Sequence, residues 1–556
     1  MKKSSIFGAM ALLAMVSCNN KELYYNANIY TADSDMPEAT AMVVEDGKIV
    51  FVGNDADAKS AAGMFATKHD MEGRRVLPGI ADTHCHYFAL CGTKCGKPTL
   101  SLDSNDSHEA ALEKIKQYAD THSKEEAPEV FGFGWGWDVK PLASELDKLG
   151  IDRPIVIFSC DGHTGWVNTL AMQMAGVDAN FKDIAPGSSY FERDADGNPT
   201  GRIVETAQAY WLTQKLGLRN SDDIYAGMLG VSQMFNAMGI TTIYDAGAFT
   251  ITDETALTAA AARNDNTLRI FASIFYNGTE TDEQYIARAK SFREKYTTEL
   301  CRPNTFKAFK DGTIEVATAY MYEPYKEPLG TGYGNCMLTT EQLLSVTKKA
   351  AAEGFNIHIH AIGDRAIGET LDVMSGLGEI SGTKTIAHCQ ILGNGVLDKF
   401  LANKDVFYQT TPVWLVEDKN FKAVFGEEFF DKYDMPLKTV HDGGVTLTFG
   451  SDAPASIPQG GMEPMKNIWA AVNQGNDPSL HNRPSENLTV AQCVDAYTIN
   501  AAKQFGAEDE IGSITAGKSA DFVVLDKDIF TIDTMEIGDV KVLETYLKGV
   551  RVYTKD

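Results

Sequence analysis

The stretch Val76-Leu-Pro-Gly-Ile-Ala-Asp-Thr-His84-Cys-His86 decides the fold, because an apolar run ends there in a His-x-His pair. Such a run predicts a buried strand whose last residues reach an edge of its sheet. Side chains alternate along a strand, so His84 and His86 face the same way, roughly 6–7 Å apart. Two neutral imidazoles at that spacing can bind one divalent ion, although an isolated pair can equally fill a core. The rest of the chain has to decide between these interpretations.

Seven further apolar runs follow, and helical patterns such as 340–353 and 363–376 lie between most of them. Eight strands in repeated strand–helix order are typical of a (β/α)8 barrel. We therefore predict an α/β protein with a TIM-like barrel over residues 79–505. The seven later strands are expected at 239–246, 268–276, 304–311, 355–360, 383–390, 406–411 and 445–452.

Both ends of the chain are rich in short strands, with an Asp46-Gly47 hairpin signal near the start. We predict that residues 22–78 and 506–556 pair into one small β-sandwich. About residues 90–235 separate the first barrel strand from the second, which is too long for a crossover. This segment predicts an inserted domain over the barrel mouth, where loops after the strands contact substrate.

The first 18 residues resemble a bacterial lipoprotein signal. Two lysines precede an apolar run that is too short to span a bilayer, and Cys18 follows it as the residue that would carry lipid. This predicts an exported protein, anchored in the cell envelope on the periplasmic or outer-membrane side, that contacts membrane only through this lipid. Met15 stands where leucine is usual, so ordinary secretion is the alternative.

The composition limits the choice of partner. With 76 acidic and 50 basic residues the formal net charge is −26, which argues against nucleic acid. The sequence sets no oligomeric state and is compatible with a homo-oligomer.

Ligand-type residues recur near the ends of the later predicted strands. The fourth strand contains Lys307 and Lys310, which face opposite ways, so only one can point inward. A buried lysine is costly unless it is paired or chemically altered, although a lysine at a strand end can also extend to water. A neutral amine can instead capture carbon dioxide, and the resulting carbamate bridges two cations. The remaining candidates are His358 and His360 on the fifth strand, His388 on the sixth and Asp452 on the eighth.

These ligand types predict a metal-dependent hydrolase. Imidazoles, a carbamate and a carboxylate suit two zinc ions, with manganese, iron or nickel as alternatives. A hydroxide held by the metals would be the nucleophile. Asp452 would accept its proton and pass it to the leaving amine.

The same residues resemble the amidohydrolase superfamily and, more narrowly, the YtcJ-like amidohydrolase family 3, from about residue 24 to 555. The motifs that carry the resemblance are Asp82-Thr-His84-Cys-His86, Trp137-Asp138, His163-Thr-Gly-Trp166, Lys307-Ala-Phe-Lys-Asp311-Gly312, His360-Ala-Ile-Gly-Asp364, His388-Cys-Gln and Gly450-Ser-Asp452. The resemblance implies a metal site of His84, His86, Lys307, His360, His388 and Asp452, and it favours Lys307 over Lys310.

The resemblance also implies cleavage of a carbon–nitrogen bond other than a peptide bond, in a small amide or an N-formyl or N-acyl compound. By the same likeness His163, Trp137, Asp138 and Trp166 would line the substrate pocket, although the tryptophans can equally be core residues.

Two other functions stay open. A heterocyclic amine deaminase would use the same metal chemistry, but deaminases of this superfamily usually have one metal and no lysine at this position. A non-catalytic, envelope-anchored binding protein would have lost at least one ligand residue.

Overall fold

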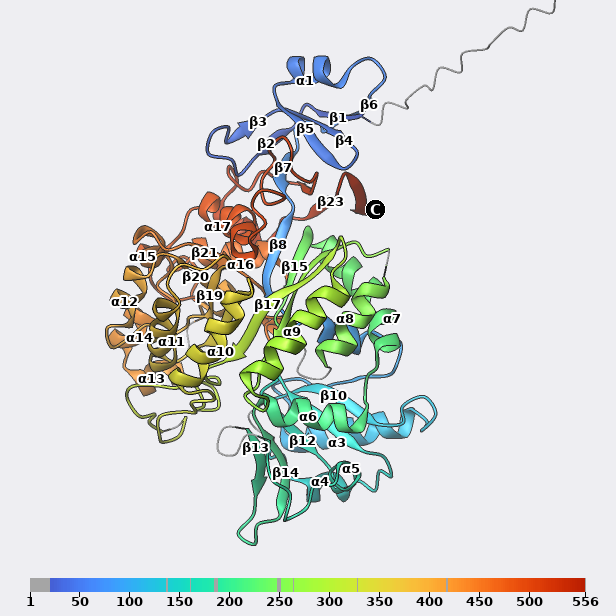
Figure 1. Cartoon of the computed structure of the whole chain (residues 1–556), viewed down its shortest axis with the longest axis vertical. Coiled ribbons are helices and arrows are strands. Elements are labelled where there is room, and N and C mark those ends of the chain that lie inside the picture. The colour runs from blue at the N-terminus through green and yellow to red at the C-terminus, as the bar shows by residue number, and fades with distance from the viewer. Residues whose placement is uncertain are drawn as a thin grey trace, which may run out of the picture.

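The computed structural model describes residues 21–136, 139–160, 162–184, 189–247, 252–263, 265–327, 329–416 and 419–555. Figure 1 shows three parts along the long axis: a β-rich part at the top, a barrel in the middle and a smaller domain at the bottom. Three residues singled out from the sequence, Cys18, Trp137 and Asp138, lie outside the described residues.

The middle part is a barrel of eight parallel strands in sequence order, as predicted. Each strand pairs with the next in parallel register, for example Lys307 with His358. The strands are β8 (Ile80–Cys85), β15 (Ile240–Asp245), β16 (Arg269–Phe275), β17 (Cys301–Phe309), β18 (Asn356–Ala361), β19 (Lys384–His388), β20 (Val406–Thr410) and β21 (Leu447–Phe449).

The segment after β21 closes the barrel against β8. The backbone N–H of Asp452 donates to the carbonyl of His84 at 2.6 Å, and the N–H of His86 donates to the carbonyl of Ala453 at 2.8 Å. Gly450 permits this approach, because a Cβ there would lie 2.5 Å from the backbone nitrogen of His84. The closure therefore brings the Asp452 segment beside the His-x-His pair.

Helices surround the barrel, and several begin where a threonine or asparagine caps them. Asn220, Thr281, Thr339 and Thr489 each form a capping box, which satisfies backbone N–H groups at the helix start. The helices after the strands are α7 (Ser221–Ala237), α8 (Asp253–Ala262), α9 (Asp282–Tyr296), α10 (Thr340–Ala352), α11 (Asp364–Gly376), α12 (Val396–Ala402), α13 (Lys419–Phe425), α14 (Glu427–Tyr433), α15 (Leu437–Asp442), α16 (Pro464–Val472), α17 (Val490–Tyr497) and α18 (Ile499–Phe505).

The two chain ends share one sheet, which confirms the predicted sandwich. In its middle β7 (Arg75–Pro78) pairs with β22 (Phe522–Leu525), with Leu77 opposite Val523. This sheet packs on the N-terminal sheet, where Tyr24 lies edge-on against Phe522 at 5.0 Å between ring centres. The other strands of the shared sheet are β2 (Asn28–Tyr30), β3 (Glu38–Ala39), β23 (Val542–Leu547) and β24 (Val550–Thr554), and the N-terminal sheet consists of β1 (Lys21–Tyr25), β4 (Ala41–Glu45), β5 (Lys48–Gly53) and β6 (Thr67–Asp70), with α1 (Asp55–Ala62) beside it.

A further domain lies between β8 and β15, after the short helix α2 (Tyr87–Thr93), and it has its own six-stranded sheet. Its core contains Phe131, Phe158 and Phe191. The elements are β9 (Leu100–Ser101), α3 (His108–Thr121), β10 (Val130–Trp135), α4 (Ala143–Asp147), β11 (Ile155–Ser159), β12 (Thr164–Val167), α5 (Thr169–Ala175), β13 (Tyr190–Arg193), β14 (Pro199–Val204) and α6 (Thr206–Leu216).

No helix among the described residues has both the length and the apolar character that a membrane crossing requires.

Candidate metal centre

Three predicted ligands meet at the carboxyl ends of the barrel strands. His84, His388 and Asp452 are all buried, and one ligand atom of each lies within 4.8 Å of the other two. His86 joins them, since its Nε2 lies 3.1 Å from Asp452 Oδ1. His84, His388 and Asp452 can therefore hold a metal ion.

Both imidazoles of the His-x-His pair are held through Nδ1. His86 Nδ1 donates to the carbonyl of Gly247 at 2.5 Å, and His84 Nδ1 lies 2.9 Å from Nε2 of His358. The Nε2 atoms of His84 and His86 are thereby turned toward Asp452, at 3.5 and 3.1 Å. Holding one ring nitrogen in this way is how proteins aim the other at a metal.

Lys307 completes the centre from β17. Its side chain is fully buried, and Nζ lies 3.4 Å from His84 Nε2. Burial lowers the pKa of Lys307 to about 7, so a large share of the amine is neutral near neutral pH. Lys310 turns the other way and pairs with Glu369 at 2.6 Å.

His360 and His388 lie on the far side of the cluster, with their ring centres 4.5 Å apart. Burial lowers the pKa of His388 to about 3 and holds the pKa of His360 and His84 well below the ordinary value. Nδ1 of His388 is buried and has no hydrogen-bond partner among the described residues. Neutral imidazoles with a free lone pair are the donors that a divalent metal requires.

Asp452 is a carboxylate in this setting. Burial alone would raise its pKa, but the neighbouring His388, His86 and Lys307 together hold the pKa below the ordinary value. The donor set of neutral imidazoles, one carboxylate and a buried amine thus fits a divalent metal centre.

Two of these residues have strained backbones. His388 has φ +73° and Asp452 has φ +49°, both in the left-handed region. Such conformations cost about 1–3 kcal/mol each and persist where the surrounding structure enforces them, often at functional sites. His388 is the last residue of β19, and Asp452 lies three residues after the end of β21. The turn at each position brings the side chain to the cluster.

The inserted domain reaches the cluster through His163. Its Nδ1 lies 2.6 Å from Glu205 Oε2, and its ring centre is 5.7 Å from that of His360. The absence of a side chain at Gly312 allows this contact, since a Cβ there would lie 2.3 Å from Glu205 Oε1. His163 is therefore placed beside the candidate metal centre.

Trp166 lies elsewhere. It is fully buried in the core of the inserted domain, where its indole donates to the carbonyl of Leu142 at 2.9 Å and stacks on His108. This packing favours the core interpretation over the predicted substrate contact. His163 directly precedes β12, whereas Trp166 lies within β12 with its side chain in the core of the inserted domain.

Sequence reasoning gave no supporting role to Asp311 or Glu205, and it named His358 only as a candidate ligand. Asp311 accepts the N–H groups of Tyr320, Ile362 and Gly363, and burial raises its pKa to about 7. Glu205 holds His163 but follows β14 without any motif that would mark it. The sequence marks His358 as a candidate because His358 and His360 repeat the His-x-His spacing of His84 and His86.

The sequence of the chain is similar to those of known proteins. The model of the Amidohydrolase family matches residues 69–553. The chain is 33% identical over 424 residues to the exoenzymes regulatory protein AepA of Pectobacterium carotovorum, covering 73% of this chain and 89% of that protein. It is 25% identical to the N-substituted formamide deformylase of Arthrobacter pascens, over 95% of this chain and 98% of that enzyme. It is 26% identical to the putative amidohydrolase YtcJ of Bacillus subtilis, over 96% of this chain and 100% of that protein.

The fold has solved counterparts. An uncharacterised metal-dependent hydrolase from Pyrococcus horikoshii superposes with a TM-score of 0.71 at 22% identity, covering 93% of this chain and 99% of that one.

Proposed function

Because the chain belongs to the amidohydrolase family, we propose that it hydrolyses a carbon–nitrogen bond other than a peptide bond, in a small amide or an N-formyl or N-acyl compound. The observation that carries this proposal is the buried amine of Lys307, 3.4 Å from His84 Nε2 inside a ring of imidazoles and one carboxylate. The relative named N-substituted formamide deformylase supports the choice of substrate class.

The residues that would hold the metal are His84, His86, Lys307, His360, His388 and Asp452, and two zinc ions suit this set. Lys307 would contribute as a carbamate: the neutral amine forms a nitrogen–carbon bond to carbon dioxide and releases a proton. Bound there, divalent metal would activate a water for attack and polarise the carbonyl of the substrate.

Asp452 would move the proton in this reaction. As a carboxylate it can accept a proton from the attacking water and then deliver it to the nitrogen of the leaving amine. Its Oδ1 lies 3.1 Å from His86 Nε2 and 3.5 Å from His84 Nε2, so the group sits at the centre of the site. His163, held by Glu205, would contact the substrate from the inserted domain.

A substrate screen combined with metal analysis tests this proposal. Purified protein is prepared with bicarbonate and under carbon dioxide depletion, and amine release is followed from N-formyl, N-acyl and cyclic amides. We expect about two metals per chain, fewer after depletion, and activity that follows the metal content. One metal without bicarbonate dependence, together with release of ammonia from a heterocyclic amine, would indicate a deaminase. No metal and no turnover would indicate a binding protein.

We also propose that the chain is exported and held in the cell envelope by lipid on Cys18. The support is the apolar run and Cys18 in the first 18 residues. Metabolic labelling with a radioactive fatty acid should mark the wild-type protein and not Cys18→Ala, and equal labelling of both would contradict the anchor.

A further inference from the structure

His358 lies directly beneath the candidate metal centre and belongs to none of the ligand positions above. It is buried, and it shares the inner face of β18 with His360, two residues further along. Its Nε2 lies 2.9 Å from Nδ1 of His84, while the other nitrogen of His84 faces Lys307 and Asp452. On its other side, the ring of Tyr244 stacks against His358 at 4.5 Å.

The two imidazoles of the His-x-His pair are therefore held differently. The partner of His86 Nδ1 is the carbonyl of Gly247, which can only accept, so the proton of His86 has to lie on Nδ1. The partner of His84 Nδ1 is a neutral imidazole, which can either accept or donate. His84 presents a bare Nε2 to a metal only when His358 accepts, which requires the proton of His358 to lie on its own Nδ1.

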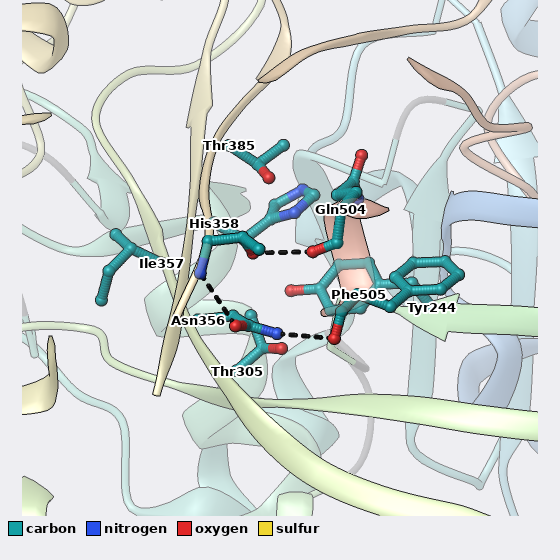
Figure 2. Close-up of a pocket in the computed structure, with 9 residues that line it drawn as sticks. Tyr244, Thr305, Asn356, Ile357, His358, Thr385, Gln504 and Phe505 are labelled. Carbon is teal, nitrogen blue, oxygen red and sulfur yellow. Dashed lines mark hydrogen bonds between the residues drawn. The ribbon is translucent and has the colours of Figure 1, made fainter. Parts of the chain in front are cut away.

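A small cavity offers a place for the proton on His358 Nδ1. The cavity has a volume of about 10 Å³ and is lined by His358 together with Tyr244, Thr305, Thr385 and Gln504, among others (Figure 2). That volume is close to the minimum for one buried water, and hydroxyl and amide groups are the partners that such a water needs. Thr385 lies directly opposite His358 in the register of β18 and β19.

We propose that His358 is a positioning residue that accepts a hydrogen bond from His84 Nδ1 and thereby fixes His84 with Nε2 free to bind metal. A water in the cavity, beside Thr385, accepts the proton of His358 Nδ1 and holds this arrangement. The inference rests on the proposed metal-dependent function and adds a residue that tunes one ligand of the centre.

Metal affinity tests this role without recourse to activity. His358→Phe keeps a ring against Tyr244 but removes the acceptor, and we expect it to bind zinc about 10- to 100-fold more weakly in competition with a chelator, as is typical for a lost partner of a ligand histidine. His358→Gln retains an acceptor oxygen and should bind within a few-fold of wild type. Tyr244→Phe is the matched control, because it changes the cavity wall and leaves the His84–His358 contact in place.

The tautomer of His84 gives a second measurement on the wild-type protein, which holds even if His358→Phe fails to fold. In metal-free protein labelled with 15N-histidine, Nδ1 of His84 should be the protonated nitrogen, with its signals identified by their loss in His84→Asn. A proton on Nε2 would overturn the inference, as would wild-type zinc affinity in His358→Phe or equally weak binding in the Phe and Gln variants. Zinc binding by wild type without amide hydrolysis would contradict only the proposed reaction, and no zinc binding at all would overturn both.

Discussion

Lys307 and Lys310 lie three residues apart, both fully buried, in very different surroundings. Lys310 has a carboxylate partner, Glu369 at 2.6 Å, and donates to the carbonyl of Leu338 at 2.8 Å. Lys307 faces imidazoles instead, with His84 Nε2 at 3.4 Å. The comparison shows that burial alone does not mark a reactive lysine. What distinguishes Lys307 is that no carboxylate among the described residues pairs with it as Glu369 pairs with Lys310, and burial lowers its pKa.

Replacing Lys307 should have the largest effect on the reaction. Lys307→Ala removes one of the proposed metal ligands, so we expect loss of bound metal and a fall in activity of about a thousandfold or more, since a bound metal would supply several kcal/mol of transition-state stabilisation. A short-chain carboxylic acid should restore part of both. Full metal occupancy in the variant would mean that the two lysines do not differ as proposed.

Asp452→Asn separates proton transfer from metal binding. The amide keeps the shape of the side chain but cannot take up a proton, so kcat should fall about 10²- to 10⁴-fold while most of the metal is retained. Metal analysis and steady-state kinetics on the same preparation check this. Activity within a few-fold of wild type would rule out Asp452 as the proton carrier.

Lys310→Met should change stability and leave the centre intact. Breaking a buried ion pair costs about 3–5 kcal/mol, and Arg365 still pairs with Glu369, so we expect a loss near 3 kcal/mol in urea unfolding. The double variant Lys310→Met/Glu369→Met should recover part of that loss, because neither charge is then left buried alone. Metal content should equal that of wild type, and a loss of metal would remove the contrast with Lys307.

The barrel could be predicted well because each of its buried strands is a separate run of apolar residues in the sequence. The sequence overestimates the last strand, expected at 445–452, because β21 ends at Phe449 and the chain turns through the left-handed Asp452. The candidate ligand residues could be named because parallel strands bring their carboxyl ends to one mouth of the barrel.

Contacts between residues far apart in the chain have no such pattern in the sequence that would predict them. His84 and His358 are 274 positions apart, and Glu205 follows its strand without a motif. Trp166 was ambiguous for another reason, because an aromatic residue near a strand end serves a core and a pocket equally well.

The pH dependence of stability tests the low pKa of Lys307 directly. Burial lowers this pKa from 10.5 to about 7 in the folded protein, whereas the unfolded chain keeps the ordinary value. Between pH 7 and 10.5 the unfolded chain binds more protons at this side chain, so the unfolding free energy rises with pH by up to about 1.4 kcal/mol per unit. Between pH 7 and 9, the unfolding free energy of metal-free wild type in buffer without carbon dioxide should therefore rise by about 2 kcal/mol more than that of Lys307→Met. Parallel curves for the two proteins would mean that Lys307 stays protonated when folded and has no neutral amine to offer.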